Sequence, residues 1–273
     1  MSAAPTAQLF NSLTANYHAH RPNYPGEILA ALSDYAAPLP AGVMVDIGSG
    51  TGILLRQLCD TFGHERRFYG IEPGKGMLAA GRSATPMHLP VTFIEASAES
   101  VPLPASSAAL ITVAQTLHWL DRKRFYAEAA RLLAKGGTFA VLYNQRDISD
   151  PLMEAYERFT NLHKPQGEGD AAEAADRGGL GIVLLRNGRF RSELTELIEF
   201  DEVAEIEHSW TKPMTPEEFV GMCLSTVQMQ NVVRSLGESE ALARLRKLIS
   251  DRIGDQETLV VPYRTSLIAA KRR

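Results

Sequence analysis

The chain has 273 residues, of which 45% are hydrophobic and 22% charged, and this composition is typical of a globular protein that can bury a full core. It contains no apolar run near the roughly 18 residues that a membrane span requires, so we expect no membrane insertion. The formal net charge is -4, and the basic residues are scattered except at the terminal Lys271, Arg272 and Arg273. This distribution argues against nucleic acid or an anionic membrane surface as a partner.

The N-terminal residues and the cysteines bear on the cellular compartment. Residues 1–9 carry no basic residue ahead of their apolar positions, which is unlike a secretory signal, and we expect a cytoplasmic protein. Cys59 and Cys223 are too few and too far apart for a disulfide framework or a zinc site, so we expect two free thiols. The seven histidines lack metal-ligand spacing, and we expect no bound metal.

Residues 1–40 are expected to form an N-terminal cap segment. Pro25 precedes a run with apolar residues at helical spacing, which predicts a helix packed on the sheet ahead of the first strand. Residues 1–24 are rich in aromatic and polar groups. This composition suits a segment that folds over a ligand.

Residues 41–150 alternate short apolar runs with helical patterns, which is typical of βαβ units around a parallel sheet. The helix before the fifth strand is predicted to end at Gly136 and Gly137. The pattern as a whole predicts a doubly wound core. Its five expected strands cover residues 43–47, 68–72, 91–95, 109–114 and 138–143.

After Tyr143 the pattern changes, and we assign residues 151–256 to a substrate or lid insertion that supplies part of the sheet, and residues 257–273 to closing strands. Met222 and Met229 lie in a run that either forms a lid over an apolar acceptor pocket or belongs to the core. The expected elements are a helix over 151–163, a mobile loop from 164, strand structure over 194–206, a helix from Thr215, a helix over 238–253 and a strand over 258–270.

A glycine-rich turn follows the first expected strand, with Gly48, Gly50 and Gly52 directly after Asp46 and Ile47. A strand that runs through such a turn into a helix presents backbone N–H groups to a ligand. The fingerprint of dinucleotide-binding proteins needs its third glycine where Ile53 stands. Glu72 ends the second strand, where a carboxylate can accept hydrogen bonds from both ribose hydroxyls of a nucleoside. That contact alone does not separate one nucleoside cofactor from another.

Several short segments can be compared with those of known families. They are the run from Val45 to Gly52, Ile71-Glu72-Pro73 with Met77-Leu78, Ala98 to Leu103, Gln115 to Trp119, and Tyr17 followed by Arg21-Pro22-Asn23-Tyr24-Pro25. Together they resemble the type 11 class I methyltransferases, and among them the subgroup of trans-aconitate methyltransferase-like enzymes. The resemblance is strong over roughly residues 10–145 and weak at residues 262–265. It implies a Rossmann-like α/β fold: a doubly wound, mostly parallel seven-stranded sheet with an N-terminal cap and a C-terminal helical lid insertion.

The resemblance implies that S-adenosylmethionine is the cofactor. Its methionyl end would lie at the glycine turn with Asp46 near the ammonium, and its ribose would bind Glu72. Its adenine would pack on Met77, with the Ala98 backbone and the Glu99 side chain at its polar edge. Ala109 departs from the family, in which the fourth strand often starts with an acidic residue. The implied cofactor-binding residues are Tyr17, Arg21, Asp46, Gly48, Ser49, Gly50, Glu72, Pro73, Met77, Ala98, Glu99 and Gln115.

Methyl transfer from a sulfonium is an in-line displacement, so a general base is needed only if the acceptor carries a proton. His118, which follows the fourth strand, is either that base or a structural hydrogen-bonding residue. Tyr143 and Asn144 end the fifth strand and either bind the acceptor or cap the sheet edge. We predict a methyltransferase for a small-molecule acceptor, as a monomer or homodimer. The alternatives are an NAD-dependent oxidoreductase on the same fold and a non-catalytic cofactor-binding regulator.

Overall fold

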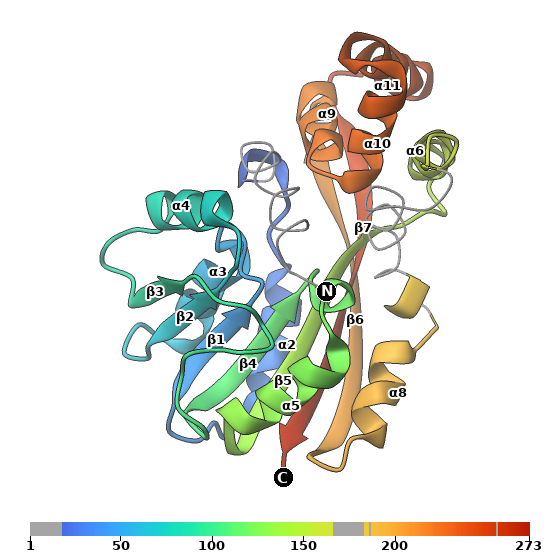
Figure 1. The fold of residues 1–273 in the computed structure, drawn as a ribbon. Helices are drawn as coiled ribbons and strands as arrows, with labels where there is room; N and C mark the ends of the chain where they lie inside the picture. The colour runs from blue at the N-terminus through green and yellow to red at the C-terminus, as the bar shows by residue number, and fades with distance from the viewer. Residues whose placement is uncertain (1–17, 166–182, 186, 255) are drawn as a thin grey trace.

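The computed structural model describes residues 18–165, 183–185, 187–254 and 256–273. The chain is built around a single sheet with the strand order β3-β2-β1-β4-β5-β7-β6 (Figure 1). The strands are β1 (Val43–Ile47), β2 (Phe68–Ile71), β3 (Val91–Ile94), β4 (Ala108–Ala114), β5 (Leu133–Arg146), β6 (Phe200–Met214) and β7 (Leu259–Arg272).

The sheet is mixed, because β7 runs antiparallel to both of its neighbours, β5 and β6. The strands from β3 to β5 are mutually parallel, and β6 runs in their direction. A mostly parallel seven-stranded sheet is therefore confirmed, with one reversed strand. The carboxyl ends of β1, β2, β4 and β5 meet at one edge, where ligands bind in open α/β sheets.

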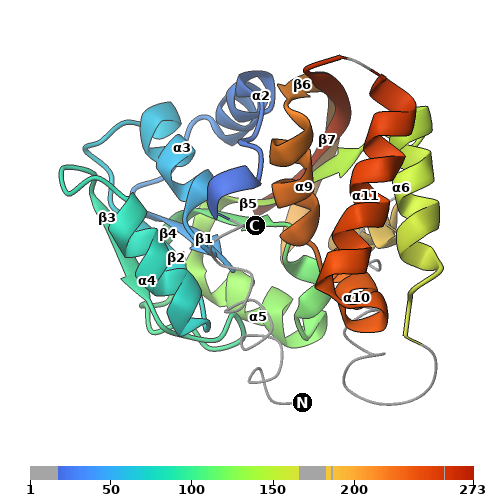
Figure 2. The same cartoon turned by 90° about the horizontal axis from the view of Figure 1, so that it is seen from above.

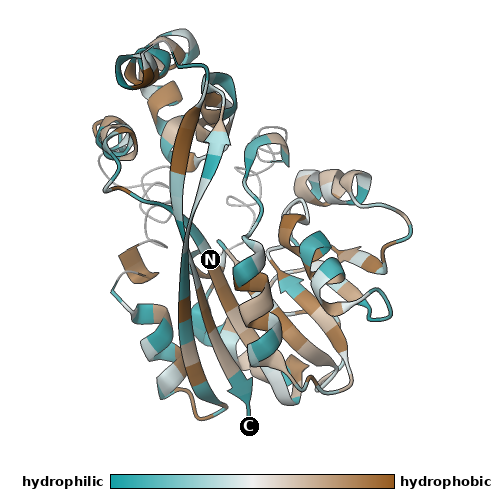
Figure 3. Cartoon of the chain, turned by 180° about the vertical axis from the view of Figure 1, so that it is seen from behind, coloured by the Kyte–Doolittle hydropathy of each residue, from teal (hydrophilic) through white to brown (hydrophobic). Residues whose placement is uncertain are grey.

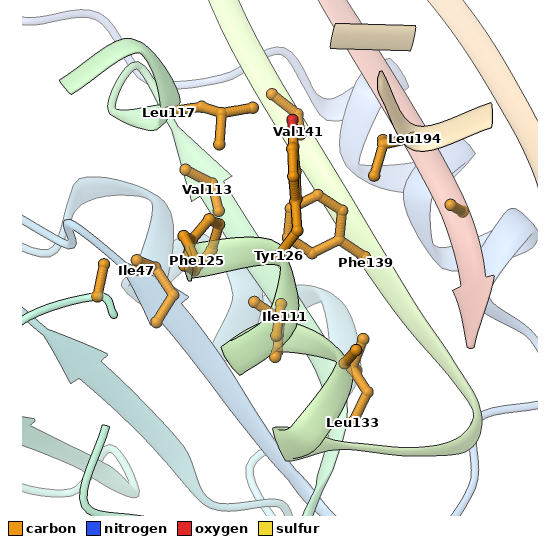
Figure 4. Close-up of a cluster of buried hydrophobic side chains, with 14 of the residues drawn as sticks. Ile47, Ile111, Val113, Leu117, Phe125, Tyr126, Leu133, Phe139, Val141 and Leu194 are labelled. Carbon is orange, nitrogen blue, oxygen red and sulfur yellow. The ribbon is translucent and has the colours of Figure 1, made fainter. Parts of the chain in front are cut away.

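Helices cover both faces of the sheet, as a doubly wound fold requires. One face packs against α2 (Gly26–Ala36) and α3 (Ile53–Phe62), and the other against α5 (Arg122–Leu132) and α8 (Arg189–Glu196). Figure 4 shows the α5 side, where Phe125 and Tyr126 lie against Phe139 of β5. Because both faces are covered, the inner strands are nearly continuous apolar runs, which appear mainly brown in Figure 3.

A third apolar cluster lies beyond the carboxyl edge, where β6 and β7 extend past the other strands (Figures 1 and 2). Its helices are α6 (Pro151–Asn161), α9 (Pro216–Leu224), α10 (Val227–Leu236) and α11 (Glu238–Ile253). We call this group the helical cluster. The predicted start of α9 at Thr215 is confirmed by a capping box, in which Thr215 and Glu218 each satisfy the other's backbone N–H. Met222 and Met229 are buried inside the cluster.

Several predicted boundaries are wrong. Strand β5 begins at Leu133 and not at residue 138, and β6 ends at Met214 and not at residue 206. The prediction of strand structure from residue 194 fails because Leu194 lies in α8, whose Phe190 and Leu194 pack on the sheet, and β6 begins only at Phe200. Helix α5 ends at Leu132, before Gly136 and Gly137, because Leu133 already pairs with Ala108 of β4. In the last two places sheet pairing and packing override the local pattern.

Several expectations fall outside the described residues, among them the loop from residue 166 and the segment up to residue 17. The helix expected after Pro25 and the closing strand are confirmed as α2 and β7. In the parts of the chain that the structure describes, no helix combines the length and the apolar character needed to cross a membrane.

Candidate active site

The glycine turn follows β1 and is fixed to β2 by two backbone hydrogen bonds, from Gly48 N (2.8 Å) and Ser49 N (3.1 Å) to the carbonyl of Ile71. Gly48, Gly50 and Gly52 all have positive φ, a conformation that favours glycine. A Cβ at Gly48 would collide with the side chain of Thr116, 2.6 Å from its Oγ1. The turn is thus packed tightly against the segment that follows β4.

Glu72 connects this turn to the start of α4 (Lys75–Ala84). Its Oε2 accepts the N–H of Gly50 at 3.1 Å, and its Oε1 accepts the N–H of Gly74 at 2.8 Å. Burial raises the pKa of this carboxyl, and the two backbone N–H groups oppose the rise. A carboxylate offers about four lone-pair positions, so two remain for a ligand at this edge.

Asp46 lies at the end of β1 and is buried, with 1% of its surface exposed. Its Oδ1 accepts a hydrogen bond of 2.7 Å from the hydroxyl of Thr112 on β4. Burial raises the pKa of this carboxyl to about 7; Thr112 opposes the rise and nearby Glu72 adds to it. In the described residues, neither Asp46 nor Glu72 forms a salt bridge with a Lys, Arg or His side chain. Two buried carboxyls without a cationic partner make this edge suited to a positively charged ligand.

The side of the edge near β3 carries the residues assigned to adenine. Met77 is 2% exposed on α4, and Ala98 is 6% exposed after β3. The carboxylate of Glu99 already accepts hydrogen bonds from Ser97 Oγ and from the backbone N–H of Asp121, at 3.0 Å. Glu99 therefore also fixes the loop that leads into α5.

Gln115 follows β4 with a φ of +58°, a strained conformation for a residue with a side chain. Its backbone N–H donates to Leu142 O at 3.0 Å, and its side-chain Nε2 donates to Asn144 O at 2.8 Å. Both bonds reach β5. They hold Gln115 between the end of β4 and the end of β5.

The two predicted catalytic side chains are brought together. His118, in the short helix η1 (Leu117–Trp119), has its Nδ1 2.8 Å from the hydroxyl of Tyr143 on β5. Burial raises the pKa of Tyr143 above its usual value, so the phenol keeps its proton. Tyr143 stacks on Phe190 of α8 with a centroid separation of 5.5 Å. The His118–Tyr143 pair is thus held in place by η1, β5 and α8.

Comparison with known proteins identifies the chemistry. Residues 45–141, which hold the glycine turn, Glu72 and His118, match the family described as a methyltransferase domain. An uncharacterized methyltransferase of Mycobacterium tuberculosis is 26% identical over 264 residues, covering 96% of this chain and 94% of that protein. This chain is an S-adenosylmethionine-dependent methyltransferase.

Two further proteins, one compared by sequence and one by structure, are similar to this methyltransferase. A ubiquinone/menaquinone biosynthesis C-methyltransferase of Campylobacter jejuni is 35% identical over 74 residues, or 27% of this chain and 30% of that protein. The structure of a protein assigned as a type II methyltransferase, from Anaeromyxobacter dehalogenans, has a TM-score of 0.64 at 24% identity. It covers 92% of this chain and 97% of that one. This likeness supports the fold.

Three of the residues that the resemblance assigns to the cofactor have the following places in this methyltransferase. Tyr17 lies outside the described residues. Arg21 donates from Nη2 to the carbonyl of Ser225 at 3.0 Å, so it contacts the end of α9. Ser49 Oγ points toward Gly70 of β2, where an added Cβ would lie 2.7 Å from it.

Thr112 and the residues around Arg146 were not predicted from the sequence as part of the site. Thr112 stands alone as a polar residue in the apolar run of β4, and that contrast is a signal that it has a buried partner. Arg146 ends β5, and its relation to Tyr156, Cys223 and Tyr263 depends on contacts between elements far apart in the chain. No local pattern carries that information.

Gly48→Ala is expected to lower the free energy of unfolding by more than 2 kcal/mol, because the added Cβ collides with Thr116 and the positive φ is strained. Gly136→Ala is the matched control. Gly136 also has a positive φ, but nothing lies within 4 Å of an added Cβ, so only the conformational cost of about 1 kcal/mol is expected. Denaturant unfolding of both variants measures the difference; equal losses would contradict the packing argument.

Proposed function

We propose that this methyltransferase binds S-adenosylmethionine between the glycine turn and Glu72 and transfers its methyl group to a small molecule that enters from the β5 side. The bound cofactor supplies an electrophilic methyl group on a sulfonium. The protein's part is to hold the two reactants in line and to exclude water. Residues that would hold the cofactor are Asp46, Gly48, Gly50, Glu72, Met77 and Gln115, with the backbones of Ser49, Pro73 and Ala98.

The observation that carries this proposal is the buried Asp46 at the end of β1. S-adenosylmethionine has two positive centres, its sulfonium and its ammonium, and an acidic turn compensates for them. NAD would instead place a pyrophosphate dianion against the same turn. Like charges in a buried site are unfavourable, so Asp46 favours the sulfonium cofactor over the nicotinamide one.

Calorimetry with the two cofactors tests the assignment. We expect saturable binding of S-adenosylhomocysteine, which keeps the ammonium and ribose of the methyl donor, and no binding of NAD. The reverse result would overturn the proposed cofactor site. Binding of the cofactor without any methyl transfer to a pool of small molecules would instead support a regulator that has lost catalysis.

His118 and Tyr143 are proposed to handle a proton of the acceptor. If Nδ1–H of His118 donates to the Tyr143 oxygen, the lone pair of Nε2 is left to accept a proton. If the phenol donates to Nδ1, then Nε2 carries the hydrogen and orients an acceptor oxygen instead. In either tautomer Tyr143 fixes the imidazole plane. Tyr143 is a positioning residue in both cases.

His118→Ala is expected to lower the turnover rate by about 100-fold, the contribution of a general base, while the affinity for S-adenosylhomocysteine stays nearly constant. Turnover is measured as S-adenosylhomocysteine release with a small-molecule cell extract as acceptor source. Tyr143→Phe keeps the ring that stacks on Phe190 and removes only the hydroxyl. We expect a smaller loss and a displaced pH profile. Equal losses in turnover and cofactor affinity for His118→Ala would indicate a structural role.

Finer assignments are also proposals. The Arg21 to Pro25 motif supports membership of the trans-aconitate methyltransferase-like subgroup. The division into a cap (1–40), a cofactor-binding core (41–150), an insertion (151–256) and closing strands (257–273) agrees with the separate apolar core of the helical cluster. We infer that this cluster, lying beside the carboxyl edge in Figure 2, borders the acceptor.

A further inference from the structure

We propose that Arg146 and the hydroxyl of Tyr263 form a subsite for an anionic group of the acceptor, a carboxylate or a phosphate. This inference rests on the proposed function, because it assigns the substrate side of that site. Arg146 is the last residue of β5, and it pairs in register with Tyr263 of β7. Both residues therefore lie where these strands leave the sheet and enter the helical cluster.

The first observation is an arginine whose guanidinium contacts two neutral side chains, those of Tyr156 and Met222. The Arg146 guanidinium lies 4.5 Å from the centroid of the Tyr156 ring, and its Nη1 is 3.6 Å from the sulfur of Met222. Burial raises the pKa of the nearby Cys223 thiol to about 11, so that group carries no negative charge at neutral pH. Among the described residues no carboxylate forms a salt bridge with Arg146.

A cation over an aromatic ring compensates for only a small part of the hydration that a partly buried guanidinium loses. Arg264 of the same sheet differs in this respect. Arg264, the neighbour of Tyr263 in β7, lies 3.9 Å from Asp147 and 4.0 Å from Glu207. The positive charge of Arg146 thus lacks the counterion that Arg264 has, and an anionic ligand supplies one.

The second observation is a buried hydroxyl that lacks a partner. Tyr263 is 4% exposed, and in the described part of the chain its hydroxyl has no hydrogen-bond partner. Burial raises the pKa of this phenol, and Arg146 and Arg21 oppose the rise, which places both guanidinium groups near it. A neutral phenol donates a hydrogen bond. A buried donor beside a guanidinium is the arrangement that binds an oxyanion.

The positions of Arg146 and Tyr263 indicate that this anion belongs to the acceptor and not to the cofactor. Two strand steps separate β1 from β5, and β7 is one step further, so Arg146 and Tyr263 lie about 10 to 14 Å across the sheet from the glycine turn. The proposed ribose and adenine contacts lie on the opposite side, toward β2 and β3. Asn144 connects the two sides: its carbonyl accepts from Gln115 Nε2, and Arg146 follows two residues later on the same face of β5.

Calorimetry on protein saturated with S-adenosylhomocysteine tests the subsite, with inorganic phosphate, succinate and neutral succinamide as probes. We expect saturable binding of phosphate or succinate, which identifies the anion, and none of succinamide. Arg146→Gln is expected to weaken that binding at least about tenfold, and Tyr263→Phe roughly three- to tenfold. The affinity for S-adenosylhomocysteine is expected to change less than about twofold. Arg264→Gln, which removes the same charge from the next residue of β7, is the control and is expected to leave anion binding unchanged.

Tyr263→Phe tests the subsite even if Arg146→Gln fails to fold. It removes a hydroxyl that has no hydrogen-bond partner among the described residues, so it is expected to melt no lower than the wild type. The proposal is overturned if neither anion binds saturably, if Arg264→Gln weakens binding as much as Arg146→Gln does, or if succinamide binds as well as succinate. A parallel loss of S-adenosylhomocysteine affinity in Arg146→Gln would assign the anion to the cofactor instead. Failure of the wild type to bind S-adenosylhomocysteine would refute the proposed function, and the anion titrations would then be read on the free protein.

Discussion

Glu72→Ala is expected to weaken S-adenosylhomocysteine binding by at least about 100-fold and also to lower the free energy of unfolding by about 1 to 3 kcal/mol. The first effect follows from the proposed loss of both ribose contacts. The second follows from the structure, in which the carboxylate accepts the backbone N–H groups of Gly50 and Gly74.

Titration calorimetry and denaturant unfolding separate the two effects of Glu72→Ala. Glu95→Ala is the matched control, because Glu95 directly follows the adjacent strand β3, is exposed and pairs only loosely with Lys75 at 3.9 Å. It is expected to leave both measurements unchanged. If Glu72→Ala lost stability but bound S-adenosylhomocysteine with wild-type affinity, Glu72 would be a purely structural link between the two turns.

Asp46→Asn is expected to stabilise the free protein above pH 7 while weakening its affinity for S-adenosylhomocysteine at least about tenfold. The pKa of Asp46 rises from an ordinary value of about 3.9 to about 7 in the folded chain. Between these values the folded chain holds a proton that the unfolded chain has released. The free energy of unfolding therefore falls as pH rises through this window and levels off above pH 7.

Cofactor binding is expected to have the opposite pH dependence. An ammonium pairs with ionised Asp46, so affinity for S-adenosylhomocysteine rises between about pH 6 and pH 8 as the carboxyl loses its proton. Asp46→Asn removes this rise. Thr112→Val removes the hydrogen bond that lowers the pKa, so the rise is expected to move to higher pH. An affinity that stays constant with pH in the wild type would contradict contact between the ammonium and Asp46.

The sequence predicted the structure correctly where a short pattern of residues specifies a local structure. The glycine turn between β1 and α3 requires residues that adopt positive φ, and no other residue type does so freely. The capping box at Thr215 and the limits of α11 are equally local, and both are confirmed. The prediction of a strand failed at residues 194–199. Helix α8 forms there up to Glu196, because its Phe190 and Leu194 pack on the sheet.

The candidate residues at the carboxyl edge came from the sequence, but the contacts between them did not. His118 and Tyr143 were separate candidates in the sequence, 25 residues apart, and the pairing of β4 with β5 places their polar atoms 2.8 Å apart. Glu99 was assigned to adenine, and the fold also gives its carboxylate to the backbone of Asp121. Contacts of this kind depend on strand order.

The sequence by itself therefore determined the cofactor turn, the alternation of strands and helices and the class of chemistry, because each depends on residue types at short spacing. Only the tertiary structure decided that Asp46 is buried with no salt bridge in the described part of the chain, that Glu72 holds two turns together, and that Arg146 pairs in register with Tyr263. The reason is physical: burial, charge compensation and proton affinity depend on what surrounds a group in space. For these residues, the surroundings come from strands and helices that are distant in the chain.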